Sequence, residues 1–195
     1  MVRRASALAI ALALAAASCY RPRDDDAGAA DDHVIPRATG AFKIDGEWNE
    51  PDWTQNHLRG QFLGFNGKLS RPTSEIRLVH DDRDVFVGLY AADDNIQSGG
   101  RDVFALSIGE LVLRIDATGK VYPPTPGVRA AADTDGTIDD PRNFDEEWRL
   151  EIAIPRELAG LESGKRVELH AARCDTPKQE GIARCGSWSG TVEAD

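Results

Sequence analysis

The apolar side chains of this sequence alternate with polar ones at a period close to two from residue 41 onward. The clearest segment is 147–154 (EWRLEIAI), in which every second side chain is large and apolar before Pro155 ends the run. This period buries one face of a β-strand and leaves the other in water, here including Glu151 and Ala153, whereas a helix needs apolar residues three and four positions apart. The alternation therefore predicts an all-β fold.

Further strand-like segments are separated by Gly, Pro, Asp and Asn, with short hairpin connections predicted at 81–83 and at Gly109. The segments 57–71 and 123–144 are predicted loops, and only 156–161 suggests a helical turn. We expect about eight or nine strands without βα alternation, which predicts an antiparallel β-sandwich of the jelly-roll or immunoglobulin-like type. Besides 147–154, the predicted strands are 74–80, 84–91, 102–108, 110–116 and 167–172.

The first 18 residues predict a signal peptide. Arg3 and Arg4 precede an apolar run over 5–17, which is shorter than the roughly 20 residues of a membrane-spanning helix. The run ends in residues 16–19 (AASC), which resemble the lipoprotein signal of bacteria, in which Cys19 would be lipidated; ordinary cleavage nearby is the alternative. Both interpretations predict export. Because Tyr20 rather than Asp follows the cysteine, the lipoprotein resemblance favours the outer membrane.

The remaining chain divides into a tether and one domain. Residues 19–37 are polar, charged and nearly free of large apolar side chains, which predicts a flexible acidic tether. Residues 38–195 contain the strand pattern without an internal repeat, so they are predicted to form the sandwich. The sequence leaves the oligomeric state open.

Charge and motif content exclude several classes of function. The chain has 33 Asp and Glu against 23 Lys and Arg, a formal charge of −10, which would repel a phosphate backbone and argues against a nucleic-acid partner. No HExxH or GxSxG motif is present, which argues against a zinc protease or serine hydrolase. Catalysis is therefore not predicted. A glycoside hydrolase needs two carboxyl groups across a cleft, and no motif in the sequence identifies which of its acids would form such a pair.

The two cysteines beyond Cys19 predict a disulfide. Cys174 and Cys185 form an even pair in a chain that is predicted to be exported to a compartment that permits disulfides. Metal ligation is the alternative, but two thiols without neighbouring His do not complete a tetrahedral set.

A set of ordered motifs resembles the family 9 carbohydrate-binding modules over about residues 42–189. In chain order these are 44–47 (IDGE), 50–53 (EPDW), 76–82 (IRLVHDD), 85–89 (VFVGL), 92–96 (ADDNI), 102–104 (DVF), 148–155 (WRLEIAIP) and 187–189 (SWS). The resemblance implies a β-sandwich that binds sugar, works beside xylan- and cellulose-degrading enzymes and often holds structural calcium.

Two of the four tryptophans are candidates for stacking on a sugar ring. Trp53 and Trp148 lie among apolar neighbours and are predicted to be structural. Trp188 lies between small residues that would leave an indole face open, and Trp48 lies in a polar, acidic segment. Because the C–H face of a pyranose packs on an aromatic plane, Trp188 is the main predicted stacking surface and Trp48 the second.

The chain departs from the family where the second clamping aromatic is expected. Residues 98–101 (SGGR) contain no aromatic side chain, so Arg101 would have to stack through its guanidinium plane, or Phe65 or Tyr122 would have to replace the missing ring. Another polar position of the family corresponds to Arg173 in this chain. We expect Asp102, Arg114 and Arg173 to contact sugar hydroxyls, with solvated side chains as the alternative.

Acidic residues in the family-like turns are candidates for calcium. Asp45, Glu47 and Asp93 offer the oxygen ligands that calcium prefers, although acids at turns also bond their own backbone. The acidic segment 133–140 does not have the register of an EF-hand loop. No cofactor is required, and a structural calcium ion is the one candidate.

The leading hypothesis is an exported, lipid-anchored protein that holds a plant-type or envelope polysaccharide by aromatic stacking, with contact to the membrane only through the anchor. The first alternative is a structural or interaction module of the same fold that has lost sugar binding. The second is a small glycoside hydrolase.

Overall fold

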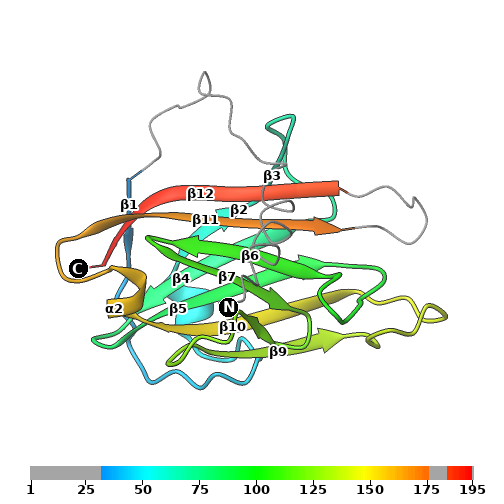
Figure 1. The fold of residues 1–195 in the computed structure, drawn as a ribbon, viewed down its shortest axis with the longest axis horizontal. Coiled ribbons are helices and arrows are strands. Elements are labelled where there is room, and N and C mark those ends of the chain that lie inside the picture. The colour runs from blue at the N-terminus through cyan, green and yellow to red at the C-terminus, as the bar shows by residue number, and fades with distance from the viewer. Residues whose placement is uncertain (1–31, 176–183, 195) are drawn as a thin grey trace, which may run out of the picture. The chain divides into compact units, whose positions relative to one another are not determined.

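Two β-sheets stack face to face in the computed structural model, which describes residues 32–175 and 184–194 (Figure 1). Two short helices accompany them, α1 (Asp52–Gln55) and α2 (Arg156–Ala159). The strands are β1 (Asp32–Ile35), β2 (Leu58–Gln61), β3 (Leu63–Gly64), β4 (Ser74–His80), β5 (Asp84–Ala92), β6 (Val103–Ile108), β7 (Leu111–Asp116), β8 (Val121–Tyr122), β9 (Arg129–Asp135), β10 (Glu147–Pro155), β11 (Arg166–Asp175) and β12 (Arg184–Ala194).

The larger sheet has seven strands in the order β1-β12-β11-β6-β7-β8, with β3 also paired to β12. The smaller sheet has five strands in the order β2-β4-β5-β10-β9. All pairs are antiparallel except β1 with β12, which is parallel. The predicted all-β sandwich is therefore confirmed, with one parallel pair at its edge.

The main core lies between the sheets. It is built from apolar side chains at the positions that the period of two in the sequence predicted to face inward. Trp148 of β10 is fully buried, and its ring centroid lies 5.1 Å from that of Phe104 on β6. Phe104 also meets Phe62 edge to face at 5.7 Å. Each such side chain contributes about 1.5–3 kcal/mol through burial, and Trp148 is structural as predicted.

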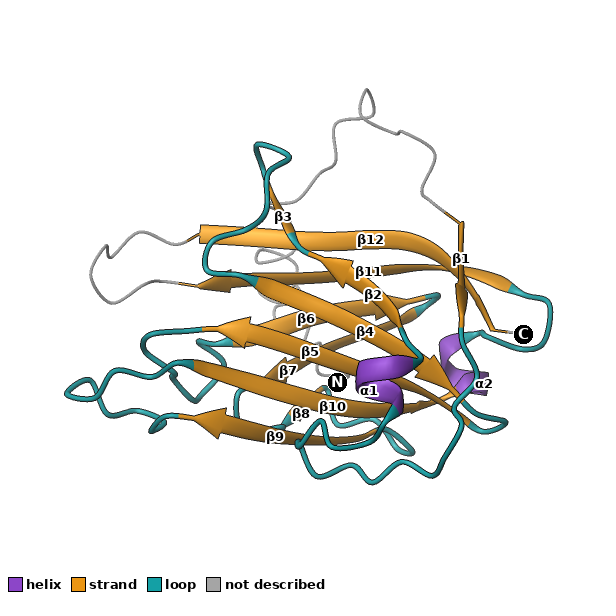
Figure 2. Ribbon diagram, turned by 180° about the vertical axis from the view of Figure 1, so that it is seen from behind, coloured by secondary structure: helices purple, strands orange, loops and turns teal. Residues whose placement is uncertain are grey.

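A second apolar cluster covers the outer face of the five-stranded sheet. Helix α1 lies over this sheet (Figure 2). The segment 38–53, which leads into α1, packs Phe42 and Trp53 against Phe86 and Ala153. β10 is consequently buried on both faces at this point. The expectation that Glu151 and Ala153 face water was wrong, because the alternation does not reveal a covering segment from a distant part of the chain.

Several predicted boundaries need correction. The tether predicted over 19–37 ends earlier, because residues 32–35 form β1 and Ile35 is fully buried. The predicted loop 57–71 contains β2 and β3, and the predicted loop 123–144 contains β9. The predicted signal peptide and Cys19 lie outside the described residues. Within the described ranges, no helix is long and apolar enough to cross a membrane.

Candidate functional site

Four charged side chains are buried together where β5 and β11 end and β6 begins. Asp93 follows β5, Asp102 immediately precedes β6, and Arg173 and Asp175 lie at the end of β11. The register pairs Arg173 with Phe104, which brings the start of β6 beside the end of β11. All four residues are at most 5% exposed, and charged groups are rarely buried to this extent without partners. We call them the charged cluster.

Arg173 holds the cluster together. Its Nη2 atom donates to Asp93 Oδ2 at 2.6 Å and lies 3.1 Å from Asp175 Oδ1, while Nη1 donates to the carbonyl oxygen of Ala92 at 3.2 Å. Trp148 adds a donor, since its Nε1 atom lies 3.1 Å from Asp93 Oδ2. The guanidinium carbon lies 5.7 Å from the Trp148 ring centroid, so Arg173 is fixed by carboxylates, a carbonyl group and an aromatic face.

Asp102 connects the cluster to a surface loop. Its Oδ2 atom accepts a hydrogen bond from the backbone nitrogen of Gln97 at 2.6 Å. Burial, followed by repulsion from Asp93, raises the pKa of Asp102 to about 7. The cluster therefore has three carboxyl groups for one guanidinium, and one of those carboxyl groups takes up a proton near neutral pH.

Two loops are fastened to each other at this end of the sandwich. Asp145 accepts hydrogen bonds from the backbone nitrogens of Ile96 and Thr137, both at 2.7 Å. The loop that contains Ile96 exposes Arg101, which donates to Gln97 Oε1 at 2.9 Å. The other loop exposes Phe144, at 67%. The two loops thus offer a cation and an aromatic ring to solvent.

The structure brings together four of the predicted site residues and separates the others. Asp93, Asp102 and Arg173 belong to the charged cluster, and Arg101 is the chain neighbour of Asp102. Arg114 lies elsewhere, exposed on β7 and paired in register with Tyr122. Sequence reasoning missed Asp175, although it lies two residues after Arg173 and therefore on the same face of the strand.

Trp188 does not present the open face that its small neighbours suggested. It shares its face of β12 with buried Gly190, Val192 and Ala194, is half-buried and packs against the main core. A Cβ atom at Gly60 would lie 2.3 Å from the Trp188 Nε1 atom, and one at Gly190 would lie 3.0 Å from the ring. The glycines let the indole fit between the sheets instead of leaving it bare.

Trp48 is also engaged, on the outer face of the five-stranded sheet. Its ring stacks on Trp53 with centroids 5.7 Å apart, and the Arg77 guanidinium carbon lies 4.4 Å from its centroid. Its Nε1 atom donates to the carbonyl oxygen of Leu150 at 3.3 Å. The half-buried indole therefore helps to attach the segment 38–53 to the sheet.

The predicted metal ligands do not converge. Asp45 forms an ion pair with Lys43 at 2.6 Å and accepts a hydrogen bond from the backbone nitrogen of Glu47. The Glu47 side chain is exposed. Both residues precede α1, whereas Asp93 lies in the charged cluster. Among the described residues, the group whose oxygen atoms could hold a metal ion such as calcium is Asp93, Asp102 and Asp175, with one atom from each within 4.8 Å of the others.

Glu151 is a second buried carboxyl group with a raised pKa. It is fully buried beneath the segment 38–53 and accepts from Trp53 Nε1 at 2.7 Å and from the backbone nitrogens of Asp45 and Gly46, both at 3.0 Å. Burial raises its pKa to about 7. Glu151 and Asp102 lie in separate buried places, so these two groups do not form the carboxyl pair that a glycoside hydrolase needs.

The predicted disulfide is confirmed. Cys174 and Cys185 face each other in register on β11 and β12, with Cα atoms 4.0 Å apart and a bond between their sulfur atoms. Because Cys174 lies between Arg173 and Asp175, the bridge fastens the end of β11 that carries the charged cluster.

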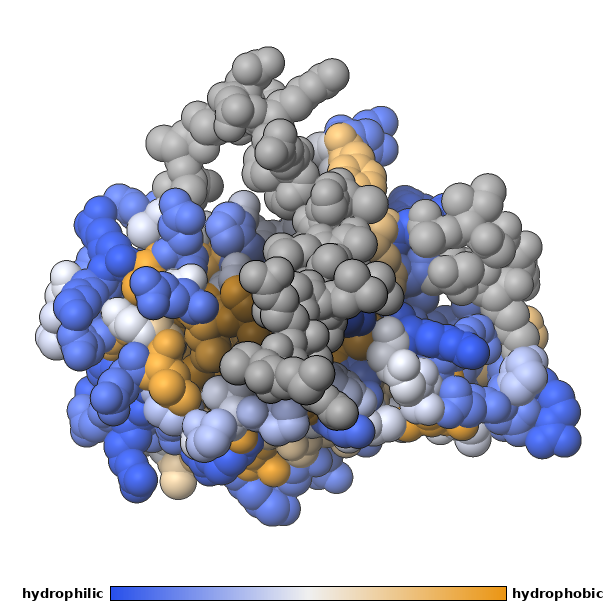
Figure 3. All heavy atoms as spheres, in the orientation of Figure 1, coloured by the Kyte–Doolittle hydropathy of each residue, from blue (hydrophilic) through white to orange (hydrophobic). Residues whose placement is uncertain are grey.

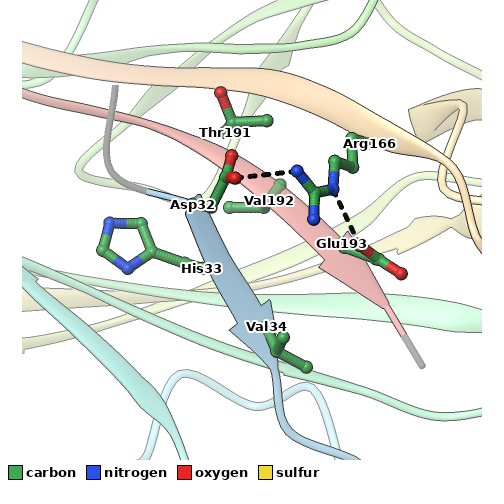
Figure 4. Close-up of a pocket in the computed structure, with 7 residues that line it drawn as sticks. All are labelled: Asp32, His33, Val34, Arg166, Thr191, Val192 and Glu193. Carbon is green, nitrogen blue, oxygen red and sulfur yellow. Dashed lines mark hydrogen bonds and ion pairs between the residues drawn. The ribbon is translucent and has the colours of Figure 1, made fainter. Parts of the chain in front are cut away.

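Two hollows lie away from the charged cluster. One of about 40 Å³ lies between β1 and β12, where Arg166 bridges Asp32 and Glu193 (Figure 4); it has the size of a water molecule rather than a sugar. A broader hollow of about 480 Å³ lies beside β8 and is lined by Lys120, Val121, Pro124, Thr125, Pro126 and Val128.

The hairpin that contains β3 projects from the molecule with apolar side chains at its surface (Figure 3). Phe65 is 77% exposed, and Leu63 and Leu69 are about half exposed. Phe65 is therefore an exposed aromatic ring, whereas Trp188 and Trp48 are half-buried.

No family model matches the sequence, and no curated protein matches it. Solved structures do match. A family 9 carbohydrate-binding module from Caldicellulosiruptor kristjanssonii in complex with cellotriose is 12% identical, with a TM-score of 0.60 over 85% of this chain and 94% of that chain. A structure of a family 9 module from the same organism in complex with glucose gives a TM-score of 0.59 at 12% identity, over 85% of this chain and 96% of that chain.

A third solved structure, from Bacteroides uniformis and named as a candidate carbohydrate-binding protein, is 11% identical, with a TM-score of 0.55 over 86% of this chain and all of that chain. The three structures thus match the sandwich over nearly its whole length. The two sheets of this chain have the fold of the family 9 carbohydrate-binding modules.

Proposed function

We propose that this chain is a non-catalytic carbohydrate-binding module. The observation that carries the proposal is the two-sheet sandwich, which matches modules solved with cellotriose and with glucose over 85% of this chain. The ligand class that follows is a β-linked glucan or a related plant-type or envelope polysaccharide.

The proposed sugar-binding surface is the loop end of the sandwich beside the charged cluster. Phe144 supplies an aromatic side chain that is 67% exposed, and Arg101 supplies exposed donors for hydroxyl groups. The charged cluster beneath fixes one loop through Asp102. In this proposal Arg173 positions the loop through its carboxylate partners and does not touch the sugar, because it is only 3% exposed.

The test is the affinity of the full chain for cello- and xylo-oligosaccharides, measured by calorimetry. We expect Phe144→Ala and Arg101→Ala to weaken binding at least tenfold, which corresponds to the loss of about 1.4 kcal/mol. Phe65→Ala is the matched control, since this equally exposed ring lies on another loop. Equal affinity in Phe144→Ala, Arg101→Ala and the wild type would reject this surface, and loss of binding in Trp188→Ala alone would assign the sugar to Trp188.

A second candidate function is a structural or interaction module of the same fold. It is favoured by the packing of Trp188 and Trp48, the two tryptophans expected to stack on sugar, into the body of the protein. This function predicts that the chain is not retarded by any soluble glucan or xylan in an affinity gel. Release of reducing sugar from xylan would instead support the glycoside hydrolase alternative.

We further propose that the chain is exported and anchored in the bacterial outer membrane by a lipid on Cys19. The sequence of the first 19 residues supports this, and the disulfide between Cys174 and Cys185 agrees with an oxidising compartment. Metabolic labelling with a radioactive fatty acid should mark the wild type and not Cys19→Ser. Equal labelling of the two proteins would refute the anchor.

A further inference from the structure

The charged cluster has the composition of a cation site. Asp93, Asp102 and Asp175 present carboxylate oxygens within 4.8 Å of one another, and each residue is at most 5% exposed. Calcium takes several such oxygens from carboxylates and backbone carbonyl groups. The family resemblance implies structural calcium in this fold. Whether these three carboxylates fit a calcium ion depends on the side chains that already contact their oxygen atoms.

Arg173 already contacts oxygen atoms of two of the three carboxylates that a calcium ion would need. Its guanidinium contacts one oxygen of Asp93 at 2.6 Å, one oxygen of Asp175 at 3.1 Å and the carbonyl oxygen of Ala92 at 3.2 Å. The same Asp93 oxygen also accepts from Trp148. A dication needs its oxygens at about 2.3–2.6 Å, which would place it against the guanidinium with like charge. The residues as they stand do not fit a calcium ion.

The charge balance points the same way. Three buried carboxyl groups without a cation would repel one another and lose hydration, a combination that buried acids avoid by pairing or protonation. The guanidinium of Arg173 neutralises one of these charges and contacts two of the carboxylates, those of Asp93 and Asp175. The cluster thus already contains a cation of its own.

We infer that Arg173 is a built-in cation that takes the place of a structural metal ion at this end of the sandwich. The guanidinium, which is part of the chain itself, makes the link between the end of β5 and β11 that a bound metal ion would otherwise make. The order of the loop end is then independent of calcium. This inference does not rest on sugar binding.

The test is thermal unfolding of the full chain in a chelator and in millimolar calcium. The wild type should unfold at the same Tm in both. Arg173→Gln removes the charged group that contacts the buried carboxylates of Asp93 and Asp175, so its Tm in chelator should fall by roughly 10 °C. Calcium should restore roughly 5 °C of that loss, because the freed oxygens can then bind it. Magnesium should restore less, because it demands a tighter octahedral site.

Arg101→Gln is the matched control, because Arg101 is exposed and its guanidinium donates a hydrogen bond to Gln97 rather than to a carboxylate of the cluster. Its Tm should match that of the wild type and should not respond to calcium. If Arg173→Gln does not fold in chelator, the variant is refolded with and without calcium. Folded protein obtained only with calcium supports the inference, and no folded protein in either condition overturns it. A rise of the wild-type Tm in calcium, or an Arg173→Gln variant that ignores calcium, would also overturn it.

Discussion

Replacement of Trp188 by alanine distinguishes a structural indole from a binding surface. The ring is half-buried, packs against the main core, and fits against Gly60 and Gly190, where added Cβ atoms would lie 2.3 and 3.0 Å from it. Its centroid also lies 5.7 Å from that of His33. Truncating a fully buried aromatic side chain costs about 3–5 kcal/mol. For a ring with part of its surface in water we expect Trp188→Ala to lower the free energy of unfolding by roughly 2–3 kcal/mol.

The assay is urea denaturation monitored by circular dichroism at 25 °C. Trp188→Phe should lose less than half as much stability, because a smaller ring still fills part of the space. Phe65→Ala is the control, because its ring is 77% exposed and its removal should change stability by less than about 0.5 kcal/mol. If Trp188→Ala is as stable as Phe65→Ala, the indole does not pack as described and the sequence-based prediction of an open stacking face is restored.

Three further predictions concern the stability of the fold, at a glycine, at the disulfide and at a buried glutamate. Gly46→Ala should lower the free energy of unfolding by more than about 2 kcal/mol, because Gly46 has φ +93 and an added Cβ atom would lie 2.4 Å from the carbonyl carbon of Ala132; an unchanged urea midpoint would contradict this. Replacing both Cys174 and Cys185 by serine should lower the free energy of unfolding by about 3 kcal/mol, since the disulfide closes a short loop with a sequence separation of 11. The reduced wild type should have the same free energy of unfolding as the double variant. Glu151 keeps a proton in the folded state up to about pH 7, so its ionisation should lower stability by up to about 3 kcal/mol as pH rises from roughly 4.5 to 7. The pKa of Asp102 is also raised to about 7, so Glu151→Gln should remove only the Glu151 part of this fall.

The strand pattern could be predicted because it is local. Residues 74–80 and 147–154 show their period of two without reference to any partner, and both form strands close to the expected bounds. The disulfide was predictable from cysteine count and inferred export. β1 and β9 were missed because strands at sheet edges that are largely half-exposed carry a weak apolar period. Their place depends on pairing with β12 and β10, which a local pattern does not contain.

The orientation of the tryptophans depended on contacts across long separations. Trp188 fits into the sandwich because residue 60, on the opposite sheet, is glycine. Nothing in the neighbourhood of Trp188 indicates that contact. The same holds for the contact between Arg173 and Asp93, which are 80 residues apart in the sequence. Residue types could name Arg173 and Trp188 as candidates for sugar contact, but only the packing shows that Arg173 is buried and that Trp188 is half-buried.

The parallel pairing of β1 with β12 sets where the domain can be cut. Residues 32–35 lie alongside residues 191–194, and Ile35 is fully buried. A truncated protein that starts at residue 38, the boundary suggested by composition, would strip the outermost hydrogen-bonding partner from the last strand. It would also remove the buried Ile35 side chain from the core and leave an unpaired strand edge on β12, which favours aggregation. Soluble versions of this module should therefore begin at or before residue 32.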